Sequence, residues 1–174
     1  MIISIDVGIK NLAYIIFNDN NEIIKWEIIE LCKHNSNKVT MIEIGLKLYE
    51  TFSDNLSEYI FDKIIIENQI GINAIRMKTL QGMITMYFIS QGQTNIYYWN
   101  SRNKLKNYDI PKKTTYNERK KYSIEITKKI IGEYYVNWNE FFLSHKKKDD
   151  LADCFLQLID SEKNNLNINA INIK

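Results

Sequence analysis

The stretch ISIDVGIKN, residues 3–11, places one carboxylate, Asp6, inside a run of Ile and Val that ends at Gly8. With residues 12–17 it predicts a strand, a short break at Gly8–Asn11 and a second strand. Burying a lone carboxylate among aliphatic side chains is costly unless a cation or a hydrogen-bond donor meets it. The partner that makes Asp6 tolerable must therefore lie elsewhere in the chain.

The composition predicts one folded domain with a substantial core. Of 174 residues, 45% are hydrophobic and 25% are charged, as is usual for a globular protein. A single Pro and six Gly favour long regular elements over a turn-rich sandwich. We expect residues 1–160 to form this domain and residues 161–174 to form a polar C-terminal tail.

Several classes of protein are disfavoured. The two cysteines, Cys32 and Cys154, form no disulfide framework, and the absence of a Cys/His cluster argues against a zinc site. No apolar run approaches the roughly 20 residues of a membrane helix, and no signal peptide is recognisable. The glycines are never closely paired, which argues against the phosphate loops of an ATPase and a small-molecule cofactor. We expect an intracellular protein without a membrane partner.

The net charge of +2 hides an uneven distribution. Between Arg102 and Lys148 there are 13 Lys and Arg against 5 Asp and Glu, a local charge of +8, whereas the remaining chain has 10 against 16, or −6. A basic half beside an acidic half favours a polyanionic partner such as nucleic acid. The alternative is a solvated helical face with spare lysines.

The hydrophobic pattern predicts the element order β-β-β-α-β-α-β-α-α. The first three strands, separated by short breaks, form an antiparallel meander. Helical spacing then covers residues 39–60 and 72–90, and short strands lie at residues 63–68 and 95–100. A basic loop leads into a helix that Gly132 ends, and residues 149–160 form the last helix. This order indicates an α/β fold with a central mixed five-stranded sheet flanked by helices, the order of the ribonuclease H-like fold.

Further acids could meet Asp6 in such a fold. Glu67 ends the fourth strand, and Asp150 and Asp153 lie about 60° apart around the axis of the last helix. If strands one and four are neighbours, all four carboxylates can converge, and their mutual repulsion requires divalent cations. Oxygen ligands suit Mg²⁺ or Mn²⁺. Each acid also has a plain interpretation: Asp6 bonds to its own turn, Glu67 and Asp150 are charges at helix N-termini, and Asp153 is solvated.

Three motifs carry a family resemblance. SIDVGIKNLAY at residues 4–14, IIIENQ at residues 64–69 and KKDDLADC at residues 147–154 resemble the poxvirus Holliday junction resolvases, a RuvC-type branch of the ribonuclease H-like superfamily. The resemblance covers about residues 1–160. It implies a homodimeric endonuclease, dependent on two Mg²⁺ ions with Mn²⁺ able to substitute, that nicks four-way DNA junctions symmetrically in recombination and viral concatemer resolution. A viral source would place it in the host cytoplasm.

The resemblance also implies roles for single residues. Asp6, Glu67, Asp150 and Asp153 match the metal-binding and catalytic acids, and Asp149 is a less favoured alternative to Asp150. For the family's catalytic lysine the sequence offers Lys120 and Lys121, with Lys104 as a competitor. The helix after IIIENQ contributes to the dimer interface in this family, and its apolar residues Met77, Leu80, Met83, Ile84 and Tyr87 could serve there or simply pack in the core.

Basic residues near these motifs are the expected DNA contacts. They are Arg76, Lys78, Arg102, Lys104, Lys146, Lys147 and Lys148. Such cations would bind backbone phosphates and make the affinity depend on salt. Two alternatives remain open from the sequence: another nuclease of the same fold that cleaves RNA–DNA hybrids, and a DNA-binding protein that has lost the chemistry.

Overall fold

A five-stranded mixed sheet forms the centre of the molecule. The structure, a computed structural model, describes residues 1–33, 35–36, 38–71, 74–111, 113–163 and 166. The strands are β1 (Ile2–Asp6), β2 (Asn11–Phe17), β3 (Ile23–Glu30), β4 (Lys63–Glu67) and β5 (Ile96–Trp99), in the spatial order β3-β2-β1-β4-β5. Antiparallel pairing joins β1 to β2 and β2 to β3, whereas β1–β4 and β4–β5 are parallel. The predicted meander and mixed sheet are confirmed.

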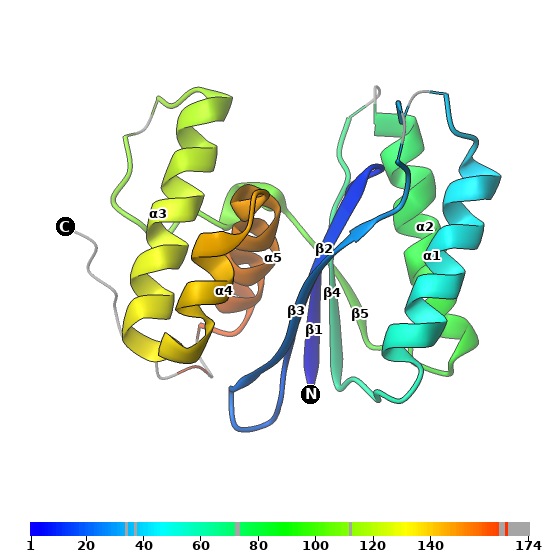
Figure 1. The fold of residues 1–174 in the computed structure, drawn as a ribbon, viewed down its shortest axis with the longest axis horizontal. Coiled ribbons are helices and arrows are strands. Elements are labelled where there is room, and N and C mark those ends of the chain that lie inside the picture. The colour runs from blue at the N-terminus through cyan, green and yellow to red at the C-terminus, as the bar shows by residue number, and fades with distance from the viewer. Residues whose placement is uncertain (34, 37, 72–73, 112, 164–165, 167–174) are drawn as a thin grey trace.

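Helices cover both faces of this sheet, which gives three layers (Figure 1). On one face lie α1 (Met41–Leu56) and α2 (Ile75–Ser90), and on the other lie α3 (Tyr116–Tyr134), α4 (Asn139–Ser144) and α5 (Lys148–Ser161). Short 3₁₀ turns, η2 (Ser101–Asn103) and η3 (Val136–Trp138), lie on either side of α3 in the chain. None of the helices in the described ranges is long and apolar enough to cross a membrane.

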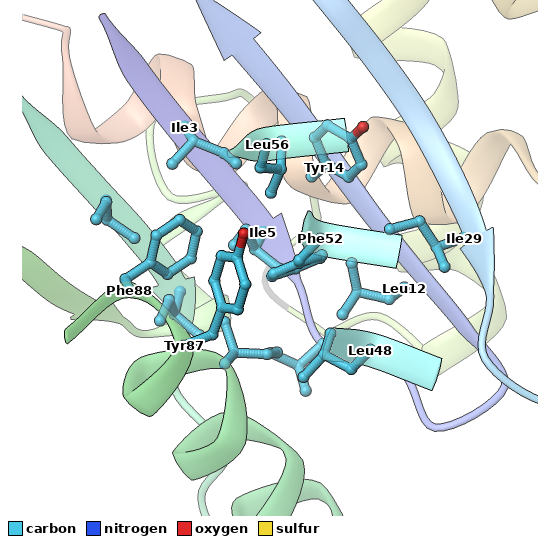
Figure 2. Packing of buried hydrophobic residues seen from close by; sticks show 14 of the residues in the cluster. Ile3, Ile5, Leu12, Tyr14, Ile29, Leu48, Phe52, Leu56, Tyr87 and Phe88 are labelled. Carbon is cyan, nitrogen blue, oxygen red and sulfur yellow. The ribbon is translucent and has the colours of Figure 1, made fainter. Parts of the chain in front are cut away.

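Strand alternation assigns each residue of β1 to one face. Ile3 and Ile5 are fully buried in the core on the α1/α2 side, where they lie in one cluster with Phe52 (Figure 2). Because successive side chains point to opposite faces, Ser4 and Asp6 face α5. The same alternation buries Ile64 and Ile66 on the α1/α2 side and turns Glu67 to the α5 side.

A second core holds the C-terminal helices on the other face. The Trp26 ring of β3 stacks on Phe142 of α4 at a centroid distance of 5.4 Å and on Phe155 of α5 at 5.4 Å. Trp26 Nε1 also donates a hydrogen bond to the Leu151 carbonyl at 3.2 Å. These contacts fix the position of α5, and therefore of its acids, against the sheet.

Some predicted boundaries differ from the structure. Gly132 lies inside α3 and does not end it, so that prediction is wrong, and the short helix α4 is not apparent in the hydrophobic pattern. The first helix starts later than residue 39 because the Thr40 and Glu43 side chains form a capping box. Of the predicted tail, residues 164–165 and 167–174 lie outside the described residues, and Leu166 is buried in the second core.

The apolar stripe of α2 belongs largely to the core. Leu80 and Ile84 are fully buried and Tyr87 is nearly so, in one cluster with residues of α1. Figure 2 shows Tyr87 beside Phe52, and the two rings meet edge to face at a centroid distance of 5.2 Å. These three residues therefore pack inside the subunit, as the plain interpretation of the stripe expects.

Candidate active site

Asp6 and Glu67 lie side by side at the carboxyl ends of two parallel strands. Asp6 is the last residue of β1 and Glu67 the last of β4. The register pairs Ile5 with Ile66, so the next positions along the two strands are those of the two acids. Both side chains face α5. The predicted convergence of strands one and four is confirmed.

The turn after Asp6 depends on a glycine. A Cβ atom at Gly8 would lie 1.9 Å from the carbonyl oxygen of Asn11, closer than any side chain can approach. Only glycine therefore allows the chain to reverse directly after the carboxylate. This requirement explains the spacing of Asp6 and Gly8 in the opening motif.

Hydrogen bonds between β1 and α5 set the position of the helix acids. Ser4 Oγ donates to the Cys154 carbonyl at 2.8 Å, and Gln157 Nε2 donates to the Ile5 carbonyl and to Ser4 Oγ, both at 3.1 Å. Ser4, Cys154 and Gln157 are completely buried. Because these bonds lie within one turn of Asp153, they fix that residue relative to Asp6.

A lysine ammonium lies at the centre of the acids. Lys104 Nζ is 3.3 Å from Asp6 Oδ1, 3.1 Å from Glu67 Oε1 and 3.2 Å from Asp153 Oδ2. The residue is only 4% exposed. Burial alone would lower the pKa of Lys104, but the surrounding carboxylates raise the pKa above its usual value. Lys104 is therefore charged, and it is the cation that makes the buried Asp6 tolerable in this structure.

The pKa values of two of these acids, Asp6 and Asp150, are shifted upward. Burial raises the pKa of Asp6 well above its usual value, and the negative charges of Glu67, Asp153 and Asp150 add to that effect against the opposing charge of Lys104. Burial, followed by the charge of Asp149, raises the pKa of Asp150 to about 6. Carboxylates that resist ionisation in this way are stabilised by any further cation.

The structure distinguishes the two adjacent aspartates at the start of α5. Asp149 Oδ2 accepts a hydrogen bond from Lys120 Nζ at 2.5 Å. Burial would raise the pKa of Asp149, but the Lys120 bond and charge hold it below its usual value. Asp150 instead lines the cleft with Asp6, Glu67 and Asp153. Asp149 is thus occupied by an ion pair, and Asp150 remains the better candidate for the site.

The acids open into a cleft of about 560 Å³. Of the cations expected from the sequence, Arg102, Lys104 and Lys120 line it. Lys121, the next residue along α3, is exposed and does not line the cleft. Lys104 lies in the acid cluster and not on the surface where a phosphate contact was expected. The cleft therefore combines an acidic floor with basic walls.

The remaining expected DNA contacts lie outside the cleft lining. Arg76 donates from one nitrogen to the carbonyls of Ser36 and Val39, at 2.8 and 2.7 Å, which ties the loop before α1 to α2. Lys78 is exposed, and it lines a separate hollow with Gln69 and Gly82. Lys146 and Lys147, directly before α5, are exposed. Lys148, the first residue of α5, donates to the His145 carbonyl at 2.7 Å.

On the cleft-facing side of α3, sequence reasoning identified Lys120 and missed the other residues. Tyr116, Arg119, Lys120 and Ser123 all line the cleft. Their positions follow the i, i+3, i+4, i+7 spacing of one helix face, so the signal was present in the sequence. Arg119 brings a second guanidinium to the cleft beside Arg102, and Tyr116 is 71% exposed at its rim.

Two glutamines, also missed, hold Glu67 from behind. Gln69 Nε2 donates to Glu67 Oε2 at 2.7 Å, and the Gln69 backbone N–H donates to Gln81 Oε1 at 2.8 Å. Gln81 is buried in α2. This chain of bonds leaves Glu67 Oε1 directed toward Lys104, so α2 helps to orient an acid of the site.

The donor set fits a hard divalent cation. Within the described residues, no three Asp, Glu, His or Cys side chains stand in the geometry of a metal site. However, three carboxylates already surround one buried cation, the Lys104 ammonium, and Asp150 lines the same cleft. A donor set made only of carboxylate oxygens is suited to Mg²⁺ or Mn²⁺.

Known proteins of similar structure share this fold. The structure is similar to that of the fowlpox virus resolvase in complex with its substrate Holliday junction DNA, with a TM-score of 0.65, 23% identity and coverage of 95% of this chain and 99% of that one. The RuvC protein of T. thermophilus, in complex with a Holliday junction substrate, gives a TM-score of 0.64 at 11% identity and covers 94% and 95% of the two chains. These similarities confirm the predicted ribonuclease H-like fold.

The sequence itself identifies the family. A protein of fowlpox virus (strain NVSL) named Holliday junction resolvase is 32% identical over 162 residues, which cover 89% of this chain and 87% of that protein. The family model described as "Poxvirus A22 protein" matches residues 1–160. The chain therefore belongs to the Poxvirus A22 protein family.

Proposed function

We propose that this chain is a structure-selective endonuclease that resolves four-way DNA junctions by metal-dependent hydrolysis of phosphodiester bonds. The observation that carries the proposal is the cleft itself. Four acids from β1, β4 and α5 meet on its floor, and Arg102, Arg119 and Lys120 line its walls. Membership of a family with a Holliday junction resolvase supports the choice of substrate.

The acids would bind the metal. Asp6, Glu67, Asp150 and Asp153 supply only oxygen ligands, for which Mg²⁺ is the proposed ion, with Mn²⁺ able to replace it. Two such ions, when bound, activate a water and stabilise the leaving oxygen of the phosphodiester. The proposed role of the protein is to hold these carboxylates at fixed spacing through the β1–β4 register and the hydrogen bonds between β1 and α5.

The cations would bind and orient the DNA backbone. Arg102 and Arg119 present planar guanidinium groups, which match the geometry of a phosphate. Lys120 lies beside them with its ammonium 5.0 Å from the centre of the Tyr116 ring. Exposed lysines before α5, Lys146 and Lys147, extend this basic surface along the backbone, and Lys78 and Arg76 remain proposed contacts on the α2 side. Binding through these groups would weaken with salt.

Symmetric cleavage of a junction calls for two sites, and we propose a homodimer. Its proposed interface is an apolar face of α1 and α2, formed by the exposed residues Ile42, Leu46, Tyr49, Met86 and Ile89. Tyr49 and Met86, with the partly buried Met83, also line one shallow hollow between the helices. Exposed apolar patches of this kind mark association sites. Met86 and Ile89, the α2 residues of this face, do not belong to the α2 stripe predicted from the sequence; of that stripe, Met83 and Tyr87 line the hollow.

Cleavage of a labelled four-way junction, with Mg²⁺ or with EDTA, tests the proposal. Linear duplex and an RNA–DNA hybrid serve as competing substrates. Asp6→Asn and Asp150→Asn should abolish the cleavage, whereas Asp54→Asn, at an exposed acid of α1, should leave it unchanged. Paired nicks in the junction that require metal support the function. Preferential cleavage of the RNA–DNA hybrid would show that the hybrid, and not the junction, is the substrate. Tight junction binding without cleavage in Mg²⁺ or Mn²⁺ would disprove the nuclease activity.

A further inference from the structure

The position of the Lys104 ammonium leads to an inference about how the site is loaded. Its Nζ contacts one oxygen each of Asp6, Glu67 and Asp153, at 3.1 to 3.3 Å. A lysine side chain has one charge and three N–H donors, so its ammonium can face three carboxylates at once. The ammonium is therefore held at one point by all three acids.

A metal ion bound by the same acids would need the same oxygens. Carboxylate oxygens lie about 2.0–2.1 Å from Mg²⁺, so an ion bound by the three oxygens that contact Nζ would take the position of the ammonium. Of the two ions of the proposed function, the inference concerns this one. A second positive charge at that position would be repelled strongly within a buried site. The ammonium and the ion therefore cannot share the three oxygens.

We propose that Lys104 and the catalytic metal ion exchange with each other: the ammonium holds the acids together in the metal-free protein and leaves them when the metal binds. The inference rests on the metal site of the proposed function. It adds a role for Lys104 as a built-in competitor, which prevents the acids from repelling one another and raises the metal concentration that the protein needs.

The structure provides a place for the displaced side chain. Lys104 follows directly after η2 and lines the cleft, as Arg102 does. An ammonium that withdraws from the acids enters this cleft, where a DNA phosphate is the available anion in the proposed complex. Metal loading and phosphate binding would then favour each other, because each removes a competitor of the other.

Metal binding to the DNA-free protein tests the exchange without any reference to cleavage. Titration calorimetry with Mn²⁺ would compare the wild type with Lys104→Met and Lys121→Met. Lys121→Met is the matched control, since it also removes one lysine charge but Lys121 is exposed and does not line the cleft. We expect Lys104→Met to bind Mn²⁺ at least about tenfold more tightly, a step of about 1.4 kcal/mol, and Lys121→Met to bind as the wild type does. Equal or weaker binding by Lys104→Met would overturn the exchange.

A second measurement uses the wild-type protein alone and covers the case in which Lys104→Met does not fold. Acetic anhydride acetylates accessible lysine side chains through their neutral amine form, and mass spectrometry locates the label. Labelling of Lys104 should rise when Mn²⁺ is added, and unchanged labelling at saturating Mn²⁺ would contradict the exchange. Asp6→Asn separates the two proposals: if it removes Mn²⁺ binding while Lys104→Met changes nothing, the metal site stands and only the exchange fails. If the wild-type protein binds no Mn²⁺, both the proposed metal site and the proposed exchange are disproved.

Discussion

Gln157 on α5 donates a hydrogen bond to the Ile5 carbonyl of β1, immediately before Asp6, at 3.1 Å. The same amide nitrogen donates to Ser4, and among the described residues its Oε1 atom has no partner. At this completely buried position, the Gln157 side chain therefore acts only as a hydrogen-bond donor within the described chain. Helix α5 is thereby fixed against β1 at the level of the acids.

Replacement of Gln157 by Leu should lower the unfolding free energy and also weaken the binding of metal at the site. Removing the donor leaves the buried Ile5 carbonyl with one partner fewer, which costs about 1–3 kcal/mol of unfolding free energy. Because the spacing of Asp6 and Asp153 then varies, we also expect the Mg²⁺ concentration for half-maximal junction cleavage to rise by about tenfold. Cleavage assays across Mg²⁺ concentrations, with urea unfolding alongside, measure both effects.

Thr127→Val is the matched control, since Thr127 is completely buried and its hydroxyl is without a partner in the described chain. Its Mg²⁺ dependence should equal that of the wild type. If Gln157→Leu also keeps the wild-type Mg²⁺ dependence while losing stability, its role is structural only.

Replacement by Ala should have opposite effects on stability at Gly8 and at Gly132. Gly8→Ala places a Cβ atom 1.9 Å from the Asn11 carbonyl oxygen, so the turn must open and Asp6 must move. We expect a loss of more than about 2 kcal/mol in unfolding free energy, with loss of junction cleavage. Gly132→Ala, in the last turn of α3 with open space around it, should instead stabilise the protein, by at most about 0.5–1 kcal/mol. A Gly8→Ala protein of wild-type stability would disprove the steric argument.

Arg119 should contribute more to DNA binding than Lys121, its near neighbour on α3. Arg119 lines the cleft, and Lys121 is exposed outside it. We expect Arg119→Ala to weaken junction binding by about tenfold and to reduce the salt slope by about one, because one phosphate contact is lost. Lys121→Ala should bind nearly as the wild type does. Fluorescence anisotropy at several salt concentrations compares the two variants. A larger effect of Lys121→Ala would show that Lys121, and not Arg119, is the main DNA contact.

The N-terminus of α3, which carries the basic wall, should respond to pH through Glu118. Hydrogen bonds from Thr115 hold the pKa of Glu118 below its usual value of 4.5. A lowered pKa in the folded state means that the ionised form stabilises the fold above pH 4.5 and that this contribution disappears as the pH falls through the lowered value. Thermal melts of Glu118→Gln and the wild type should therefore differ slightly at pH 7 and converge in acid. A difference that grows as the pH falls would contradict the assignment.

The apolar face of α1 and α2 can be tested by charge. Leu46→Glu places a carboxylate in the proposed interface, where 60% of Leu46 is exposed in the single subunit. We expect this variant to be monomeric in analytical ultracentrifugation and to lose paired nicking. Ile60→Glu, at a more exposed Ile outside that face, should behave as the wild type does. A Leu46→Glu protein that associates as the wild type does would place the interface elsewhere.

The sequence predicted the strands, and the placement of the acids on them, because both leave local signals. Asp6 and Glu67 each follow an apolar run typical of a buried strand, and a spacing of three residues put Asp150 and Asp153 on one side of a helix. Each of these signals depends only on neighbouring residues. The adjacency of the two strands was a condition of the predicted acid cluster, and the observed strand order meets it.

The cations of the site were harder to assign. Lys104 lies in a polar segment without periodicity, and only the tertiary fold carries its ammonium to Asp6, 98 residues away in the sequence. The choice between Asp149 and Asp150 likewise depended on Lys120, which pairs with one of them across two helices. Gly132 was wrongly expected to end its helix because glycine is common at helix ends, whereas the buried Ile130 and Ile131 keep this turn packed in the core.

The order in which the acids occur along the chain has a consequence for synthesis on the ribosome. Asp6 and Glu67 are made early and can pair within the sheet, but Asp150 and Asp153 belong to α5, the last helix of the described chain. The buried contacts of Ser4 with Cys154 and Gln157 form only when that helix emerges. A nascent chain therefore completes its acid cluster only after α5 has been made, and an incomplete chain released before residue 148 is a protein without a full set of acids.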